Sequence, residues 1–521
     1  MLEKIEIRVD PKTAAVSEEL IKYIGRFLKI DTTRIVHIDI LRRSIDARQR
    51  NVVVNLSVAV HIDSKYEMEP VEAPCYVPIA DNAPQAIVVG SGPAGLFAAL
   101  KLIELGVRPI VLERGKDVDE RRKDLAMIAR TGHIDPDSNY AFGEGGAGAY
   151  SDGKLYTRSK KRGDVTRILA ILHTHGAPRD ILVDAHPHIG TNLLPDIIKN
   201  IRLTIERFGG QVHFNTRVDG LLFAEDKTEV RGVRTVDGRE FHGPVILATG
   251  HSARDIYLSL RDSDVQLQPK GIAVGVRLEH PAHLIDCLQY HSSQGRGKYL
   301  PAAEYSMLTR VDNRAVYSFC MCPGGVVVPA STHDGEIVVN GMSPSNRGTR
   351  WSNSGMVVEV LPEDIPGDDV LRVMYFQKQI EQAFYNDICE GQNAPAQRMT
   401  DFVAGKLSGD LPLTSYAPGI HPARIDKLLP RPIAYRLQKG FAAFNAKQTG
   451  FLTEEAVLIG PETRTSAPVR IPRDPMRMHH IEIKGLYPAG EGAGYAGGIV
   501  SAAIDGENCA VALSSQIFNF Q

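Results

Sequence analysis

The feature that most constrains the fold is a glycine-rich turn that directly follows a short apolar run. Residues 86–89 have the pattern of a buried strand, and Gly-Ser-Gly-Pro-Ala-Gly then occupies positions 90–95 before a stretch of helical character. Each glycine meets a separate need. Gly90 makes the tight turn, Gly92 lets backbone approach a pyrophosphate, and Gly95 permits close contact between helix and strand.

The residues after this turn indicate a dinucleotide site. The helix that begins near Pro93 and Ala94 directs its free N–H groups and the positive end of its dipole towards phosphate. A second strand, 109–112, ends at Glu113, about twenty residues past the first glycine. A carboxylate there accepts hydrogen bonds from both ribose hydroxyls and repels a 2′-phosphate.

Two later segments favour FAD over NAD. FAD is the longer molecule and needs a second cradle for its ribitol and isoalloxazine. Residues 486–499 have the form of such a cradle: a strand ends at Ala-Gly-Glu (489–491), and a helix begins at the glycine pair 497–498 with its dipole available to the flavin. The Ala-Thr-Gly turn at 248–250 closes an apolar strand, as is usual in flavoproteins of this architecture.

Composition excludes several classes of protein. The chain has 43% hydrophobic and 23% charged residues and a net charge of −2, so no global field favours nucleic acid or an anionic membrane. No apolar stretch reaches the length of about 20 residues that spans a bilayer, and the N-terminus lacks the apolar core of a signal peptide. Six cysteines in a chain of 521 residues do not form a disulfide framework. We expect a cytoplasmic protein without membrane segments.

The pattern of strands and helices predicts an α/β chain with an interrupted cofactor domain. Residues 1–80 form a small α+β module of βαββ order, with a proline-rich linker at 70–84. The first part of a Rossmann-type FAD-binding domain follows at 81–268. An inserted α+β substrate domain occupies 269–468, and the C-terminal part of the FAD-binding domain occupies 469–521.

Six longer motifs resemble those of a bacterial family of FAD-dependent dehydrogenases, within the glutathione-reductase-like superfamily of FAD/NAD(P)-binding proteins. They stand in family order and cover nearly the whole chain, at 44–48, 142–155, 248–255, 319–325, 462–471 and 485–498. The resemblance implies FAD, an inserted substrate domain and oxidoreductase activity, and it leaves the substrate open. It also implies that a second glycine-rich loop wraps FAD and that the backbone near Val218 contacts the adenine.

The FAD-binding residues expected from the motifs and the resemblance are Gly90, Gly92, Pro93, Ala94, Gly95, Glu113, Arg114, Gly145, Gly146, Ala147, Gly148, Ser151, Gly153, Lys154, Val218, Ala248, Thr249, Gly250, Gly490, Glu491, Gly497, Gly498 and Ile499.

Two cysteines are candidates for redox chemistry. Cys320 and Cys322 flank one methionine at the end of an expected strand, where period-two alternation places them on one face with Ser318. A dithiol facing the flavin could relay electrons. A bridge between cysteines this close in sequence is strained, however, and the Cys-x-x-x-x-Cys of flavin disulfide reductases is absent from the Rossmann helix. Buried, inert cysteines are the favoured interpretation.

Other candidates have a structural interpretation beside the catalytic one. His251 directly follows the 248–250 turn, and a structural hydrogen bond is favoured there over proton transfer. Arg464 ends the inserted domain, where it either holds an anionic substrate or reduced flavin or forms an inter-domain salt bridge. His186 and His188 have no cysteine or carboxylate cluster near them in sequence, so we expect no metal.

The leading hypothesis is an FAD-dependent oxidoreductase, a dehydrogenase or reductase, in which a small molecule exchanges a hydride with flavin N5 between the cofactor and inserted domains. Residues 270–468 contain no second strand–glycine-turn–helix unit for NAD(P)H. Electrons would then come from the substrate itself or from a redox partner protein.

Two alternatives remain. A flavin-dependent RNA-modifying factor would use the basic cluster of the N-terminal module, formed by Arg42, Arg43, Arg48 and Arg50. That patch is short and lacks interleaved aromatic residues, so a solvated face or a domain contact is favoured and nucleic acid is not an expected partner. The other alternative is a non-catalytic flavoprotein that acts as a sensor or scaffold.

Overall fold

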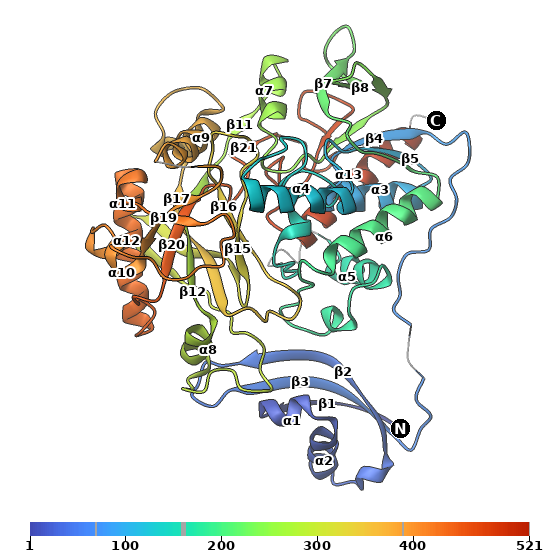
Figure 1. The fold of residues 1–521 in the computed structure, drawn as a ribbon. Helices are drawn as coiled ribbons and strands as arrows, with labels where there is room; N and C mark the ends of the chain where they lie inside the picture. Colours follow the sequence, from blue (N-terminus) through green and yellow to red (C-terminus); the bar gives the residue numbers. More distant parts are fainter. Residues whose placement is uncertain (68–69, 158–162, 388–389, 520–521) are drawn as a thin grey trace.

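The computed structural model describes residues 1–67, 70–157, 163–387 and 390–519 (Figure 1). We name three parts after their sheets. The N-terminal module has a three-stranded sheet, the parallel-sheet region has five strands from distant parts of the chain, and the inserted region has a seven-stranded sheet. The inserted region lies beside the parallel-sheet region, and the module lies at one end of the molecule (Figure 1).

The N-terminal module forms because an amphipathic helix covers one face of an antiparallel sheet. Its elements are β1 (Leu2–Val9), α1 (Pro11–Ala15), α2 (Ser17–Leu28), β2 (Ile35–Asp46) and β3 (Val53–Ile62), with strand order β1-β3-β2. Leu20 and Ile24 of α2 are buried against the apolar residues of the strands. The short helix α1 adds to the expected βαββ order, and the Asp10 carboxylate caps its first turn.

The parallel sheet joins two stretches of chain that are far apart in sequence. Its strands are β4 (Gln85–Val89), β5 (Arg108–Leu112), β6 (Gln211–His213), β10 (Val245–Leu247) and β22 (Leu486–Pro488), in the order β22-β10-β4-β5-β6. The strands are nearly continuous apolar runs because both faces of the sheet are covered. Along β4, Ala86 and Val88 face one core, and Ile87 and Val89 face the other.

Helices cover one face of this sheet, and a small antiparallel sheet covers the other. On the first face lie α3 (Pro93–Glu104), α5 (Val165–Thr174), α6 (Leu194–Arg207) and α13 (Ile499–Asn519); on the second lie β7 (Val218–Phe223), β8 (Val230–Thr235), β9 (Glu240–His242) and α7 (Arg254–Asp262). Helix α4 (Val118–Thr131) packs beside α6. Helix α13 crosses α3 closely at Gly506, where a Cβ would lie 2.0 Å from the Ala94 carbonyl oxygen.

The chain leaves and re-enters the parallel-sheet region through two neighbouring strands. These are β11 (Gln268–Pro269) and β21 (Val469–Arg470), which pair antiparallel. The Lys270 N–H donates to the Pro468 carbonyl at 2.9 Å just beyond them. This paired neck lies where the sequence predicts the limits of the insertion.

The inserted region is a mostly antiparallel sheet packed against helices. Its sheet order is β13-β14-β17-β12-β20-β18-β19, in which only β18 and β19 pair parallel. The strands are β12 (Ile272–Pro281), β13 (Leu308–Val311), β14 (Arg314–Cys322), β17 (Trp351–Val360), β18 (Ala394–Arg398), β19 (Ile420–Pro422) and β20 (Val457–Glu462). Outside the sheet are the hairpin of β15 (Val326–Pro329) and β16 (Val339–Met342) and the helices α8 (Ala282–Tyr290), α9 (Arg372–Tyr385), α10 (Met399–Ala404), α11 (Ile425–Leu428) and α12 (Arg431–Lys447).

The core of the inserted region forms under α12. Leu437, Phe441 and Phe444 of this helix are fully buried. Gly440 lets the sheet approach, since a Cβ there would lie 2.6 Å from Val316 Cγ1. Strand β16 begins at Val339, shortly after Glu336, whose side chain contacts Arg254 across the domain boundary.

Candidate functional site

A cavity of about 370 Å³, here called the main cavity, lies where the ends of β4, β5 and β10 meet the inserted region. Its volume is typical of ligand-binding pockets, and open α/β sheets bind ligands at this edge. Glycine-rich loops of the parallel-sheet region form one side. Phe319, Cys320, Asn340 and Arg464 of the inserted region contribute to the wall on the other side.

The first glycine-rich loop leaves space above the start of α3. Gly90 has a φ of +102°, and a Cβ on Gly95 would lie 1.9 Å from the Gly90 carbonyl oxygen, so neither position tolerates a side chain. Gly92 differs, because a Cβ there would meet nothing closer than Gly146 Cα at 3.9 Å. Gly92 lines the main cavity and caps α3, whose first N–H groups have no partners within the helix.

Glu113 ties the loops at the cavity edge together. Its Oε2 accepts hydrogen bonds from the N–H and the hydroxyl of Ser91, at 2.9 and 2.8 Å. Its Oε1 accepts from the N–H groups of Gly115 and Gly143, at 2.9 and 3.0 Å. The expected hydrogen bonds from the ribose hydroxyls to Glu113 stay a prediction. In this prediction a ribose hydroxyl takes the place of the Ser91 hydroxyl as a donor to the carboxylate.

The second glycine-rich loop lies against the first. The Gly145 N–H donates to the Ser91 carbonyl at 3.0 Å, and the cavity wall then continues through residues 146–148 and 151–154. Gly153 has a φ of +69°, which favours glycine at this bend. The two loops therefore form one continuous side of the main cavity.

Most of the predicted FAD-binding residues line the main cavity. They are Gly90, Gly92, Pro93, Ala94, Glu113, Arg114, Gly146, Ala147, Gly148, Ser151, Gly153, Lys154, Val218, Ala248, Thr249, Gly250, Glu491, Gly497, Gly498 and Ile499. Gly95, Gly145 and Gly490 are not in the wall. They are packing positions: a Cβ on Gly145 would lie 2.5 Å from Ile198 Cδ1, and one on Gly490 would lie 2.8 Å from the Cβ of Ala94.

The start of α13 provides a second open cradle. A Cβ on Gly497 or Gly498 would meet no atom within 4 Å. Burial raises the pKa of the nearby Glu491 carboxyl to about 7, and the Lys270 ammonium opposes this rise. One cavity thus contains two helix N-termini with open space above their glycines, which fits an extended molecule with a pyrophosphate, such as FAD.

His251 lies in the cavity wall at the end of β10. Its Nδ1 is 2.8 Å from the Ser252 hydroxyl. Burial, followed by the charges of Arg464 and Arg254, lowers the pKa of the imidazole to about 4. A general acid or base works best with a pKa near the operating pH, so this neutral imidazole fits the structural interpretation.

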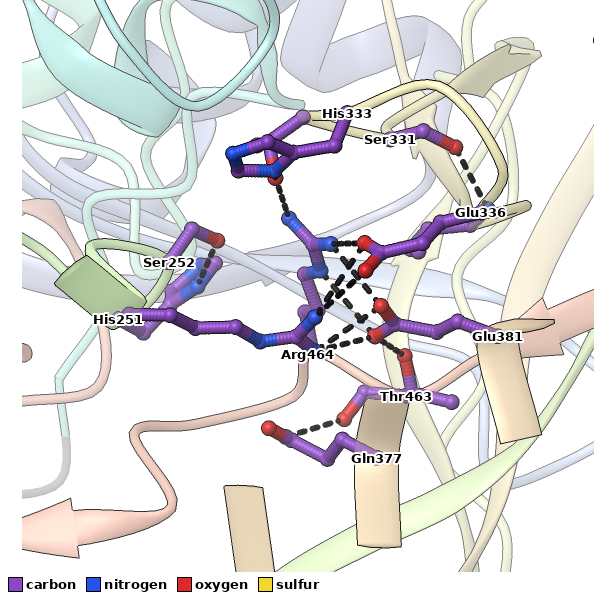
Figure 2. A network of polar contacts seen from close by, with 12 residues as sticks. His251, Ser252, Ser331, His333, Glu336, Gln377, Glu381, Thr463 and Arg464 are labelled. Carbon is purple, nitrogen blue, oxygen red and sulfur yellow. Dashed lines mark hydrogen bonds and ion pairs between the residues drawn. The ribbon is translucent and has the colours of Figure 1, made fainter. Parts of the chain in front are cut away.

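Two arginines and two glutamates form a closed network between the regions (Figure 2). We call Arg254, Arg464, Glu336 and Glu381 the arginine–glutamate network. Arg254, on α7, contacts Glu336 at 3.3 Å and Glu381 at 2.9 Å, and Arg464 contacts each carboxylate at 3.0 Å. Arg464 also donates to the Thr332 hydroxyl at 2.8 Å.

The charges of this network are balanced internally. Burial by itself would raise the pKa of Glu381, but Arg464 and Arg254 lower it to about 2. Glu381 also accepts a hydrogen bond from the Thr463 hydroxyl at 2.6 Å. The salt bridges of Arg464 stay within the inserted region, and it is Arg254 that joins the two regions through the same carboxylates. Arg464 also lines the main cavity, so its contact with an anionic substrate or reduced flavin stays a prediction.

The cysteines lie on a β-bulge that breaks the expected alternation. Phe319 pairs with Gly355 and Cys322 pairs with Asn353, so Cys320 and Met321 together stand opposite one residue of β17. A bulge re-aims side chains. Cys320, with a φ of +43°, lines the main cavity, whereas Cys322 is fully buried. Cys320 is therefore half-buried at the cavity wall and not enclosed like Cys322, and the inertness of both cysteines stays a prediction.

Two cations hold this bulge. Arg277 Nη2 donates to the Cys320 carbonyl at 2.7 Å and lies 3.1 Å from the Cys322 sulfur. The Lys154 ammonium donates to the Met321 carbonyl from the opposite side of the domain boundary. We call Cys320, Cys322, Arg277, Lys154 and Glu462 the cysteine cluster.

The cluster shifts the protonation of its members. A hydrogen bond from Cys322 lowers the pKa of the Cys320 thiol to about 6, against the effect of burial and with help from Arg277 and Lys154. Burial raises the pKa of Cys322. Burial also raises the pKa of Glu462 to about 7, although Arg277 Nη1 lies 2.9 Å from this carboxyl.

Sequence reasoning missed several residues of the site. Arg277 stands in the middle of the apolar run of β12, and a charge at the centre of a buried strand was a signal that could have indicated it. Arg254 falls inside the 248–255 motif but was not singled out. Glu336, Glu381 and Asn340 carried no local signal, since their partners lie far away in sequence.

The remaining candidates have ordinary structural partners. His186 lies 3.4 Å from Glu304, and His188 Nε2 lies 3.0 Å from the Ser345 carbonyl. Arg43 binds Asp184 of the parallel-sheet region at 2.6 Å, which makes it a domain contact.

Within the described ranges, no group of three or more His, Cys, Asp or Glu side chains is placed to hold a metal ion. None of the described helices is long and apolar enough to cross a membrane.

Comparison with known protein families identifies the cofactor. Residues 84–131 match the family described as "FAD binding domain", and residues 271–465 match "FAD-dependent protein, C-terminal domain-like". Residues 1–61 match a domain of unknown function. FAD is the cofactor, as the sequence predicts, and the chain is a flavoprotein.

Solved structures resemble the fold distantly. A putative FAD-containing monooxygenase from Photorhabdus luminescens is 11% identical with a TM-score of 0.36, and the match covers 84% of this chain and 90% of that one. The 3-ketosteroid-Δ4-(5α)-dehydrogenase from Rhodococcus jostii RHA1 is 12% identical with a TM-score of 0.34, over 85% and 99% of the two chains. We transfer no activity from either protein.

A full-length relative shows the family. An uncharacterized protein from Clostridium beijerinckii is 40% identical over 504 residues, which cover 93% of each chain. The match therefore extends over nearly the whole chain. This chain belongs to the same family of FAD-binding flavoproteins as the Clostridium beijerinckii protein.

Proposed function

We propose that the protein is an FAD-dependent oxidoreductase, a dehydrogenase or reductase, in which a small molecule exchanges a hydride with flavin N5 where the main cavity meets the inserted region. One observation carries the proposal: a single cavity is lined both by the FAD-binding loops and by Phe319, Cys320 and Asn340. The loops account for the cofactor, so the side chains of the inserted region are left to contact the substrate.

FAD supplies the two-electron chemistry when it is bound, and the chain supplies position and charge. The N-termini of α3 and α13 stabilise negative charge on the pyrophosphate and the flavin ring. Glu491, whose pKa lies near 7, can hold or release a proton at neutral pH within the same cavity.

The form of the inserted region supports an electron source other than NAD(P)H. Over its described residues the sheet is antiparallel except for β18 and β19, and no strand–glycine-turn–helix unit occurs there. We propose that electrons come from the substrate or from a redox partner protein. Stopped-flow mixing with NADH or NADPH should bleach the flavin more slowly than about one per second. Faster, saturable bleaching would refute this part of the proposal.

Two finer assignments rest on the same features. Membership of the glutathione-reductase-like superfamily is supported by the chain order of the first loop, the 248–250 turn and the C-terminal cradle. A cytoplasmic location is supported by the described cysteines, each of which is free.

The RNA-modifying alternative has weaker support, because Arg43 and Arg48 are paired with Asp184 and Asp46. A sealed scaffold fits less well with a cavity that opens onto the inserted region.

The first test is the cofactor itself. Purified protein should be yellow and release FAD on denaturation, and Gly92→Val should yield colourless protein, because a branched side chain would enter the space reserved for the pyrophosphate. Gly409→Val is the control. Gly409 does not line the main cavity, and a Cβ there would meet no atom within 4 Å. Full FAD occupancy in Gly92→Val would contradict the assignment.

The second test identifies the substrate class. Small molecules are added anaerobically to the oxidised and the reduced holoprotein, and the flavin absorbance is followed. A dehydrogenase or reductase should show saturable bleaching or reoxidation with at least one compound class. Variation at Asn340, which lines the cavity, should change the half-saturating concentration without releasing FAD. Failure of every class with a fully loaded protein would favour the scaffold alternative.

A further inference from the structure

The backbone at Cys320 adopts a conformation that side chains avoid. Its φ of +43° lies in the left-handed region, where non-glycine residues are uncommon. The strain occurs inside a bulge that faces the main cavity, and strained backbone of this kind clusters at functional sites.

The two thiols lie against each other and between two cations. The Cys322 thiol donates to the Cys320 carbonyl at 3.4 Å, and a hydrogen bond from Cys322 also lowers the pKa of the Cys320 thiol. Arg277 contacts the Cys322 sulfur, and Lys154 holds the carbonyl of the intervening Met321. Cations beside a thiol stabilise its thiolate, which is the reactive form in disulfide chemistry.

Cys509 shows what an inert cysteine looks like in this protein. It is also fully buried and also contacts an arginine, with its sulfur 3.4 Å from Arg473 Nη1. That arginine is neutralised by Asp505 through bonds of 2.9 and 2.5 Å. Cys509 has no second described thiol as a partner and does not line the main cavity.

We propose that Cys320 and Cys322 form a redox-active dithiol that exchanges two electrons with FAD, with Cys320 as the member that faces the cavity. In the forward direction an Sγ–Sγ bond forms, the two thiols lose two electrons and two protons, and FAD takes up both to become FADH₂. The reverse reaction opens the disulfide. The inference rests on the proposed function, since it requires FAD in the main cavity, and it adds a second electron site beside the flavin.

Tryptic digestion offers a direct test, because the peptide from Ala315 to Arg347 contains both cysteines and no other. Air-oxidised holoprotein, quenched in acid and then unfolded with guanidinium at neutral pH in the presence of N-ethylmaleimide, should give this peptide without label and two hydrogens lighter than the dithiol. After anaerobic reduction by dithionite and removal of the excess, it should carry two labels. Two labels in the air-oxidised protein would overturn the proposal, and this result needs no variant that folds.

An anaerobic dithionite titration gives an independent measure. The parent should accept about four electrons per FAD, two by the flavin and two by the disulfide, and Cys322→Ser should accept about two. Cys287→Ser, a half-buried cysteine on α8, is the matched control and should still accept about four. An uptake of about two electrons by the loaded parent would refute the dithiol while leaving the proposed function intact. Protein that lacks FAD would instead refute the proposed function.

Discussion

The arginine–glutamate network and the cysteine cluster reach the same cavity, the first through Arg464 and the second through Cys320 and Lys154, yet they use charge in different ways. In the first, each guanidinium faces both carboxylates, and one carboxylate is held firmly ionised. In the second, Arg277 faces one carboxyl whose pKa is raised, and Arg277 and Lys154 together act on one thiol whose pKa is lowered. Paired charges join the two regions in the network, whereas in the cysteine cluster two cations lower the pKa of a thiol against the opposing charge of Asp152.

The largest expected effect comes from unbalancing the network. Glu381→Gln leaves two buried guanidiniums with one carboxylate, and breaking a buried ion pair costs about 3–5 kcal/mol. We expect a large fall in the midpoint of thermal unfolding of the holoprotein. Glu363→Gln, at an exposed position, is the control. Equal effects of the two substitutions would show that the network does not hold the regions together.

The pH dependence of stability should separate the two clusters. The pKa of Glu462 is raised to about 7, so between about pH 4.5 and pH 7 the folded protein binds more protons here than the unfolded chain does. The contribution of Glu462 to the free energy of unfolding is therefore lost as the pH rises through that window, by roughly 3 kcal/mol.

Glu462→Gln should remove this decline, as measured by urea unfolding at a series of pH values. Glu381, whose folded pKa is about 2, has the opposite sign: its contribution is present above its unfolded pKa and disappears as the pH falls towards 2. The same pH profile in Glu462→Gln and in the parent would contradict the assignment.

A thiol-labelling profile tests the reactive side of the comparison. In the reduced protein, the alkylation rate of Cys320 by iodoacetamide should reach half its maximum near pH 6 and level off above pH 7, because only the thiolate reacts. Cys509, whose pKa is raised to about 12 by burial, is the internal control and should stay unlabelled in the folded protein. A midpoint near 8.5 would mean that the Cys322 hydrogen bond and the cations together do not lower the pKa of this thiol.

The smallest effect isolates one cation. Lys154→Met removes the ammonium beside the bulge and should raise the labelling midpoint of Cys320 by about one pH unit, equivalent to about 1.4 kcal/mol. Lys298→Met is a suitable control, because the Lys298 ammonium lies over the Tyr299 ring and does not line the main cavity. An unchanged midpoint in Lys154→Met would assign the shift to Arg277 and the Cys322 hydrogen bond alone.

Local patterns located the loops on the cofactor side of the cavity. A strand, a glycine turn and a helix are adjacent in sequence, so the needs of Gly90, Gly92 and Gly95 can be read from neighbouring residues. The predicted loops line the cavity, and the FAD prediction is confirmed by the family matches. The superfamily, the substrate and the roles of single residues stay predictions.

The substrate side could not be predicted in the same way. Arg277 and Glu462 meet across the sheet, and Arg254 meets Glu381 across the domain boundary, so neither pair leaves a signal at a fixed spacing. The bulge at Cys320 depends on the register of β14 against β17. Period-two alternation assumes an unbroken ladder, and it therefore predicted the wrong environment for Cys320.

The paired neck of β11 and β21 has a consequence for how such a protein can evolve. The chain leaves and re-enters the parallel-sheet region at adjacent positions, joined at Lys270 and Pro468. With respect to the parallel sheet, the whole inserted region is therefore connected in the same way as a single surface loop. The entropy of closing a loop grows only slowly with its length. Recombination at the neck can therefore exchange the inserted region for another one while the FAD-binding loops of the parallel-sheet region stay intact. New substrates can be acquired in this way, by replacement of one region.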